Sequence, residues 1–254
     1  MTVHDAPQLT QPADPPPAGG SARPLLIGLG IAFAVLSIVA GTLNVIGSIG
    51  RDSVQRQASY QGIRVVDVDV SAESVQIVAG PDDVTRLDRT IGWSLQKPSF
   101  SERQEGDRLV IRSSCGITFG RGCSGKVRLV VPADVQVHAH SSGGYVGATG
   151  LSGPLDLSSS AGHVEGVRLA SATVEADSSA GSVSLTFAVA PTDVKATGSA
   201  GSVEVLLPPG DEAYRVDAGS SAGSSEVSVR TDPDSSRRIV AHSSAGSVEV
   251  SYSE

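Results

Sequence analysis

The chain has 254 residues, of which 39% are hydrophobic and 4% are aromatic, and its formal net charge at pH 7 is −8. A nucleic-acid binder needs a surplus of Lys and Arg on some face, and no basic run occurs. Nine aromatic residues are also too few for the stacking platforms on which single strands lie. The composition excludes a nucleic-acid partner and leaves room for one full domain or two small ones.

The first 50 residues divide into a polar tail and an apolar segment. Residues 1–23 are rich in Pro and lack a periodic apolar pattern, which predicts a disordered tail. Residues 24–50 carry no charge, and as a helix they would span about 40 Å, against a hydrocarbon core of about 30 Å. We therefore predict a single transmembrane helix. The small residues before position 51 leave a cleaved signal peptide as the alternative.

One face of this predicted helix carries small and polar residues at spacings of three and four: Gly30, Ala34, Ser37, Gly41 and Asn44. Membrane helices approach closely along such a stripe, and an Asn side chain can hydrogen-bond across it. We predict lateral self-association through this face. The alternative is that the stripe reflects only the ordinary abundance of small residues in membrane helices.

The two cysteines bear on which side of the membrane the long C-terminal part lies. Cys115 and Cys123 enclose seven residues, three of them glycines, and so short a loop suits a disulfide. The alternative, a pair of metal-binding thiols, lacks a nearby histidine. Because disulfides persist in oxidising compartments, we expect the C-terminal part to be extracellular and the tail to be cytoplasmic. The charges flanking residues 24–50 do not decide the orientation.

Residues 141–254 repeat one phrase, Ser-Ala-Gly-Ser-Val, with small variations. The phrases are centred on glycines that lie 18 to 23 residues apart: Gly144, Gly162, Gly181, Gly201, Gly223 and Gly246. Apolar residues alternate with polar ones on both sides of each glycine, which is typical of strands with one buried face. We expect each repeat to be a strand, a glycine turn and a second strand, and we expect the glycine to supply the positive φ of a type II turn.

Residues 51–140 predict a less regular part of the same body. Alternating or continuous apolar runs occur at 63–70, 75–78, 109–111 and 127–131. We expect an all-β fold of stacked parallel coils, about 4.8 Å apart, as in a β-solenoid. A β-sandwich is the alternative, because strand pairing is not visible in a sequence. The single tryptophan, Trp93, is expected to pack in the core or a lid, with ligand stacking as the alternative.

These residues carry a resemblance to a known family. The run from Val127 to Val135, the phrase Ser142-Gly143-Gly144-Tyr145-Val146 and the serial Ser-Ala-Gly-Ser-Val phrases resemble the bacterial "putative adhesin" family of β-strand repeat proteins. The resemblance covers residues 60–254. It implies a right-handed parallel β-solenoid-like fold, often tethered to a membrane, with adhesion as the function, and it transfers no catalytic residue.

The sequence offers few candidate catalytic, metal-binding or phosphate-binding residues. The repeated serines are explained as turn and ladder residues. His138 and His140 would share one face of a strand and could bind a metal with a third ligand, but solvated histidines are the preferred interpretation. The glycines do not open a helix and so form no phosphate-binding loop. We expect no catalytic residue, no cofactor and no metal site.

An acidic column is the one predicted surface feature. Glu165, Glu204, Glu226 and Glu249 each follow a repeat glycine by three residues, so parallel stacking would align them on one outer face. Residues 141–254 hold 14 acidic against 6 basic side chains. Adjacent like charges on paired strands are unfavourable unless they are solvated or neutralised. The preferred interpretation is a solvated face, and the alternative is a docking strip for cations or for a basic envelope partner.

Together these features predict a single-pass protein of the cell membrane, with a β-repeat domain outside that acts by binding or scaffolding. Its partner would be the bilayer together with a protein or polymer of the cell envelope or surface. The alternative is an envelope sensor that signals through the cytoplasmic tail.

Overall fold

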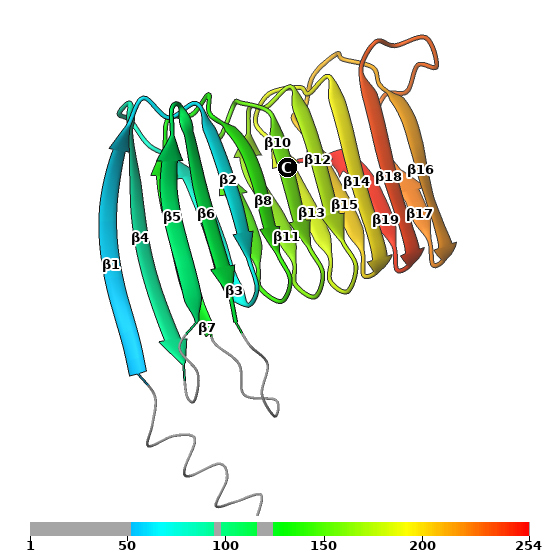
Figure 1. Ribbon diagram of the computed structural model, residues 1–254. Helices are drawn as coiled ribbons and strands as arrows, with labels where there is room; N and C mark the ends of the chain where they lie inside the picture. Colours follow the sequence, from blue (N-terminus) through cyan, green and yellow to red (C-terminus); the bar gives the residue numbers. More distant parts are fainter. Residues whose placement is uncertain (1–51, 94–97, 116–123, 254) are drawn as a thin grey trace, which may run out of the picture. The chain divides into compact units, whose positions relative to one another are not determined.

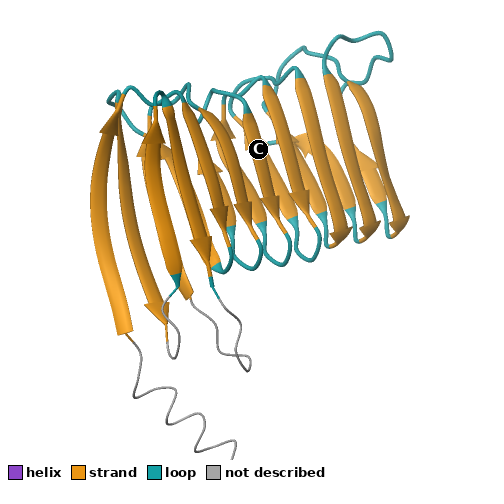
Figure 2. Cartoon of the chain, in the orientation of Figure 1, coloured by secondary structure: helices purple, strands orange, loops and turns teal. Residues whose placement is uncertain are grey.

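The computed structural model describes residues 52–93, 98–115 and 124–253, all in the second of two units into which the chain divides, Gly47–Glu254. These residues form strands joined by loops (Figure 2). Within these ranges no helix is long and apolar enough to cross a bilayer. The predicted tail, the predicted transmembrane helix and its association face at Gly30, Ala34, Ser37, Gly41 and Asn44 lie outside the described residues.

The strands form two sheets. In spatial order, the first sheet contains β1 (Asp52–Gln61), β4 (Val84–Trp93), β7 (Ser124–Val131), β3 (Glu73–Ala79), β9 (Val146–Thr149), β11 (Val164–Leu169), β13 (Val183–Phe187), β15 (Val203–Leu207), β19 (Val248–Tyr252) and β17 (Ser225–Val227). The second contains β16 (Arg215–Ala222), β18 (Arg238–Ala245), β14 (Asp193–Ala200), β12 (Thr173–Ser178), β10 (Leu155–Ser159), β8 (Gln136–Ser141), β2 (Val65–Val70), β6 (Arg108–Ser114) and β5 (Ser99–Glu105).

The chain passes from one sheet to the other at every repeat. A strand of the second sheet ends at a corner near the repeat glycine, and the next strand belongs to the first sheet (Figure 1). Neighbouring repeats pair in parallel and in register, as in Leu155↔Val174 and Val164↔Val183. The all-β fold and the parallel pairing of the repeats are therefore confirmed. The sandwich alternative was right only in that two sheets face each other, because their strands are successive parts of parallel coils.

The spatial order of the coils departs from the chain order at the C-terminal end. The final coil, β18–β19, lies between β14–β15 and β16–β17, so the coil that comes before it in sequence closes the stack. Registers such as Val194↔Ile239 and Val216↔Ile239 show that the inserted coil matches both neighbours.

The opposite end is closed by antiparallel strands. β1 pairs with β4 and β4 with β7 on the first sheet, and β5 pairs with β6 on the second. The apolar runs of the sequence predicted β2, β3, β6 and β7. They did not predict β1, β4 and β5, because polar residues in these strands interrupt the alternation of apolar and polar positions. Asp52 at the start of β1 pairs with Trp93 at the end of β4.

The core is a set of aligned apolar rows between the sheets. Side chains alternate in and out along each strand because the backbone is pleated, and parallel register stacks the inward ones. A buried row on the second sheet is Val66, Val137, Leu155, Val174, Val194 and Ile239, and a buried row on the first is Val75, Val146, Val164, Val183, Val203 and Val248. These residues belong to one continuous hydrophobic cluster.

The corner glycines (Gly144, Gly162, Gly181, Gly201, Gly246 and Gly223 in spatial order) are required by close packing of the coils. A Cβ on Gly162 would lie 2.1 Å from the carbonyl oxygen of Gly144, and one on Gly181 would lie 2.3 Å from that of Gly162. The expected positive φ holds only in part, since among the six it occurs at Gly201, Gly223 and Gly246. Contact between backbones, rather than turn type, accounts for all six.

A row of serines, four of them buried and Ser220 half-buried, holds the corners together. We call Ser141, Ser159, Ser178, Ser243 and Ser220 the inner serine row. Ser159 Oγ donates to the carbonyl of Gly144 at 2.8 Å, Ser178 Oγ to that of Gly162 at 2.8 Å, and Ser243 Oγ to that of Gly201 at 2.7 Å. Each of these three carbonyls thus receives a donor from the neighbouring coil, which avoids the cost of an unpaired polar group.

Candidate binding surface

A second row of serines lies one residue further along each repeat and faces solvent. This outer serine row consists of Ser142, Ser160, Ser179, Ser199, Ser244 and Ser221, all exposed. No hydrogen bond from these hydroxyls occurs within the part of the chain that the structure describes. Because the repeats pair in register, successive hydroxyls stand about 4.8 Å apart. The row is therefore a regular array of donors and acceptors that is open to a ligand.

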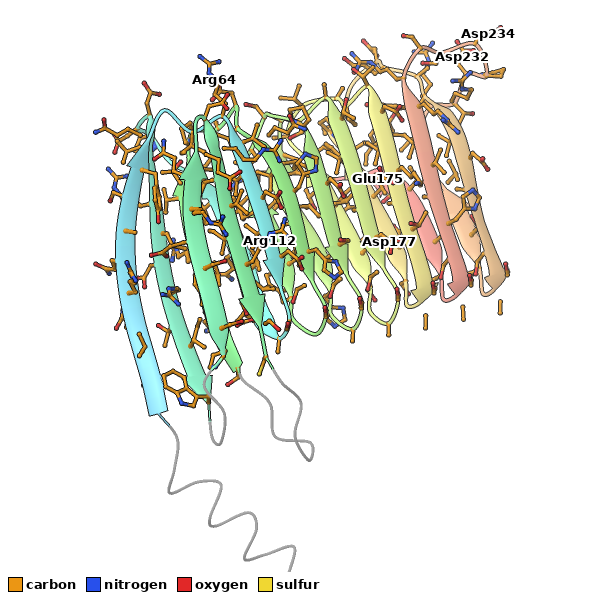
Figure 3. All side chains as sticks on the ribbon, viewed as in Figure 1. Arg64, Arg112, Glu175, Asp177, Asp232 and Asp234 are labelled. Carbon is orange, nitrogen blue, oxygen red and sulfur yellow. The ribbon has the colours of Figure 1, made fainter. Side chains whose placement is uncertain are left out.

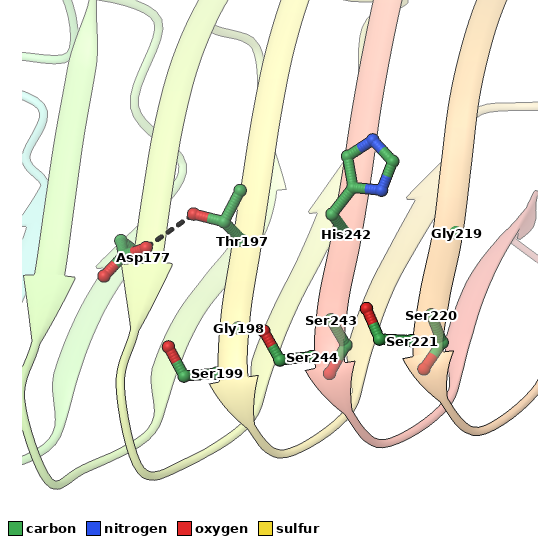
Figure 4. Close-up of a pocket in the computed structure, with 10 residues that line it drawn as sticks. All are labelled: Asp177, Thr197, Gly198, Ser199, Gly219, Ser220, Ser221, His242, Ser243 and Ser244. Carbon is green, nitrogen blue, oxygen red and sulfur yellow. Dashed lines mark hydrogen bonds between the residues drawn. The ribbon is translucent and has the colours of Figure 1, made fainter.

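The outer serine row borders a groove on the second sheet. The groove has a volume of about 510 Å³ and crosses β12, β14, β18 and β16. Figure 4 shows Thr197, His242 and Gly219 on neighbouring strands, with Ser199, Ser244 and Ser221 nearer the corners. Gly219 lacks a side chain where the adjacent strands carry His242 and Thr197, and this absence opens the groove. The lining is polar, with hydroxyls, an imidazole and the carboxylate of Asp177.

One hydrogen bond and one histidine–carboxylate contact shape the groove. Thr197 Oγ1 donates to Asp177 Oδ2 at 2.5 Å, which fixes the threonine against the neighbouring strand. His242 Nε2 lies 3.2 Å from Asp217 Oδ1, and its ring lies over Gly219. Among the described residues, the hydroxyls of Ser199, Ser244 and Ser221 in the groove have no hydrogen-bond partner, whereas those of Ser220 and Ser243 donate to corner carbonyls.

The segment Gly219-Ser220-Ser221-Ala222-Gly223 has the Gly-x-Ser-x-Gly spacing of a hydrolase nucleophile, which the sequence analysis overlooked. That motif works on a sharp strand-to-helix turn, whereas here it joins two strands of a coil. Ser220 Oγ donates to the carbonyl of Gly246 at 2.6 Å. No hydrogen bond among the described residues joins a serine hydroxyl to His242.

The structure brings the predicted acidic column together on the first sheet. Glu204 lies beside Glu249, and Glu249 beside Glu226, on three adjacent parallel strands. Glu165 lies further along the row and is separated from Glu204 by Ser184, whose Oγ donates to Glu204 at 2.8 Å. Whether the column docks cations or a basic partner stays a prediction.

Tyr145 continues this row at its other end. Its ring lies over Gly147, where a Cβ would strike the phenol, and its hydroxyl donates to Glu165. Burial raises the pKa of Tyr145, and the hydrogen bond to Glu165 and its charge raise that pKa further. The tyrosine therefore stays neutral and ties one coil to the next.

Charged side chains gather elsewhere on the unit. Arg64, Asp232 and Asp234 lie on loops at the edge opposite the corners, whereas Glu175 and Asp177 lie on β12 (Figure 3). Lys195 Nζ donates to Glu175 at 2.5 Å, and this hydrogen bond raises the pKa of Lys195. The corners at the six repeat glycines carry no Asp, Glu, Lys or Arg.

The two histidines and the two cysteines complete the predicted sites. His138 lies on β8 between Asp67 and Asp156, and its Nδ1 is 3.2 Å from Asp156 Oδ2, whereas His140 Nδ1 lies 3.0 Å from Ser158 Oγ. No cluster of ligands suited to a metal ion occurs among the described residues. Cys115 directly follows β6, and Cys123 lies outside the described residues, so their disulfide stays a prediction.

Comparison with known proteins gives a distant likeness only. No protein-family model and no curated protein matches the chain. Two crystal structures align with it: a "putative cell adhesion protein" from Clostridium sporogenes ATCC 15579 (8% identity, TM-score 0.44, 80% of this chain and 100% of that one) and a "putative adhesin" from Bacteroides fragilis NCTC 9343 (13% identity, TM-score 0.45, 78% and 96%). Identities and TM-scores this low do not reveal what this chain binds.

Proposed function

We propose that this protein is a non-catalytic binding protein of the adhesin type, which holds an extended polyhydroxyl polymer, a glycan, against the outer serine row and its groove. The observation that carries the proposal is the row itself: six exposed hydroxyls at one repeat position with no partner among the described residues. These hydroxyls face solvent, where each can donate and accept hydrogen bonds, so they are available to pair with a ligand.

A glycan suits this surface because its hydroxyls both donate and accept, as do those of serine and threonine. Asp177 supplies an acceptor, and His242 supplies a polar ring above Gly219. The constant spacing of about 4.8 Å allows a repeating polymer to make similar contacts at successive coils. Each contact is weak, and affinity would accumulate along the row by multivalency.

The proposal includes the location predicted from the sequence. We propose that residues 24–50 anchor the chain in the cell membrane, with the β unit outside and residues 1–23 in the cytoplasm. The uncharged segment and the two closely spaced cysteines support this arrangement.

The test is co-sedimentation of the purified chain with isolated bacterial envelope and with its extracted polysaccharide. The variant carries Ser199→Ala, Ser244→Ala and Ser221→Ala. We expect it to lose at least tenfold in affinity, because three neighbouring contacts are removed. The matched control carries Ser152→Ala and Ser236→Ala, two exposed serines outside the groove. Equal binding by the variant and the control would contradict the proposal, as would binding to protein-only fractions.

A further inference from the structure

A second, chemically different pocket lies at the end of the stack that the antiparallel strands close. Its volume is about 260 Å³, and it is lined by Val54 and Arg56 of β1, Arg89, Ile91 and Trp93 of β4, and Pro98 and Phe100 next to or within β5. Because β1 and β4 belong to the first sheet and β5 to the second, the pocket opens between the two sheets. Its walls are mainly aliphatic and aromatic, as is usual for small-molecule sites.

An ion pair beside this pocket, between Arg89 and Glu102, is incompletely satisfied. Arg56 Nε lies 3.0 Å from Glu102 Oε1, but Arg89 Nε lies 3.8 Å from Glu102 Oε2, which is too far for a hydrogen bond. Both atoms of the longer pair are buried and have no hydrogen-bond partner among the described residues. Buried polar atoms are normally satisfied, so an exception calls for an explanation.

The charge balance adds to this observation. Two guanidinium groups face one carboxylate, and the Arg89 guanidinium stacks on the Phe100 ring at 3.7 Å from its centroid. Burial lowers the pKa of Arg89, because desolvation disfavours its charged form. The pocket thus holds a surplus positive charge beside apolar walls.

We propose that this pocket binds an anionic amphiphile, an aliphatic chain that ends in a carboxylate. The carboxylate would pair with the guanidinium groups of Arg56 and Arg89, which favour planar, two-oxygen partners. The aliphatic chain would contact Val54, Ile91 and Trp93. This site is separate from the outer serine row, so either can fail without the other.

The test uses Trp93, the single tryptophan of the chain, as an internal reporter. The full chain is titrated with octanoate and, in parallel, with octan-1-ol, which has the same chain length and no charge. We expect octanoate to change the Trp93 fluorescence in a saturable manner, and octan-1-ol to bind at least tenfold more weakly. No saturable change with octanoate, or equal affinity for octan-1-ol, would overturn the proposal.

Two variants test whether Arg56 and Arg89 supply the positive charge that binds the carboxylate. Arg56→Gln and Arg89→Gln are each expected to weaken octanoate binding at least tenfold. Arg86→Gln, on the same strand but paired with Asp82 at 2.6 Å outside the pocket, is the matched control and should bind as the unmodified chain does. The Arg56 side chain is 60% exposed, so Arg56→Gln is expected to fold. If Arg89→Gln fails to fold, the octanoate affinity of Arg56→Gln decides the test. Unchanged octanoate affinity in Arg56→Gln would contradict the site.

Discussion

The inner and outer serine rows place the same residue type at neighbouring positions of each repeat, with opposite roles. Ser178 is buried and donates to the carbonyl of Gly162, whereas Ser179 is exposed and its hydroxyl has no partner among the described residues. The pleat of the strand sends one side chain inward and the next outward. One short phrase therefore supplies both the bonds that hold the coils together and a surface that can bind a ligand.

The largest effect is expected from closing the space between corner backbones. Gly181→Ala would place a methyl group 2.3 Å from the carbonyl oxygen of Gly162, 2.7 Å from its carbonyl carbon and 3.0 Å from Ser178 Oγ, so the backbone of Gly162 would have to shift. We expect a loss of about 3 kcal/mol in the free energy of unfolding, or failure to fold, since overpacking and strain give the large losses among point mutations. Urea denaturation measures it.

The matched control is Gly143→Ala in the first corner, at the position where most other repeats carry Ala. The nearest atom to the added Cβ is the carbonyl oxygen of Ser71 at 3.4 Å, an ordinary contact. We expect a change within about 0.5 kcal/mol. A similar loss in both variants would show that the corners resist any added methyl group, not only one aimed at a carbonyl.

The two serine rows are compared directly by Ser178→Ala and Ser179→Ala. The first removes the donor to the buried Gly162 carbonyl and should cost about 1–2 kcal/mol. The second removes a hydroxyl exposed to solvent and should cost less than about 0.5 kcal/mol. Thermal unfolding of the two variants measures the difference. Equal destabilisation would break the distinction between the rows.

The strands of the repeats can be predicted from the sequence, whereas the order of the strands in the sheets cannot. The glycine period and the alternation around it identify the strands of the repeats, because both are local properties of the chain. The strand order is not local. Ile239 suits a place beside Val194 as well as a place beside Val216, and only the complete packing sets β18 between them.

The first coil shows a second limit of sequence reasoning. Glu73 begins β3 at the level of the corner glycines, its backbone carbonyl accepts a hydrogen bond from Ser141 Oγ, and its buried carboxylate accepts one from Ser113 Oγ. A glutamate in place of a glycine breaks the repeat phrase, so the coil formed by β2 and β3 cannot be recognised as a repeat from the sequence pattern. The groove also escaped prediction, since it depends on the missing side chain of Gly219 beside His242.

Tyr145 tests a corner where the usual small serine is replaced. Its hydroxyl donates to Glu165, and its pKa is raised by burial and by that carboxylate. With the folded pKa above the unfolded value near 10, this contribution to stability is complete below pH 10 and is lost as pH rises further. We expect Tyr145→Phe to lower stability at pH 7 by about 1 kcal/mol and to reduce the alkaline loss. Urea titrations from pH 7 to 11 measure both, and an unchanged alkaline loss would contradict this role for Tyr145.

The gap in the inner serine row can be filled. β14 has Gly198 where its neighbours carry an inner serine, so the Gly181 carbonyl has no serine donor of the kind that the other corners have. Gly198→Ser would supply one, and its Cβ would meet Val203 Cγ2 at 3.2 Å, a contact that a small shift relieves. We expect a gain of about 0.5 kcal/mol, measured by thermal unfolding. A loss above about 1 kcal/mol would show that the strand needs glycine there for space.

The smallest effect is expected on the acidic column, in which Glu226 and Glu249 are exposed and Glu165 and Glu204 are half-buried. Glu249 stands between Glu204 and Glu226, so Glu249→Gln removes two unfavourable neighbours, whereas Glu226→Gln on the edge strand removes one. We expect Glu249→Gln to gain about 0.5 kcal/mol at low salt and Glu226→Gln about half of that, with both gains vanishing in 1 M NaCl because the repulsion is screened. Urea midpoints at two salt concentrations measure this. If millimolar calcium stabilises the unmodified chain more than the Glu249→Gln variant, the column binds cations. An equal response leaves it as a solvated face whose neighbouring carboxylates repel one another.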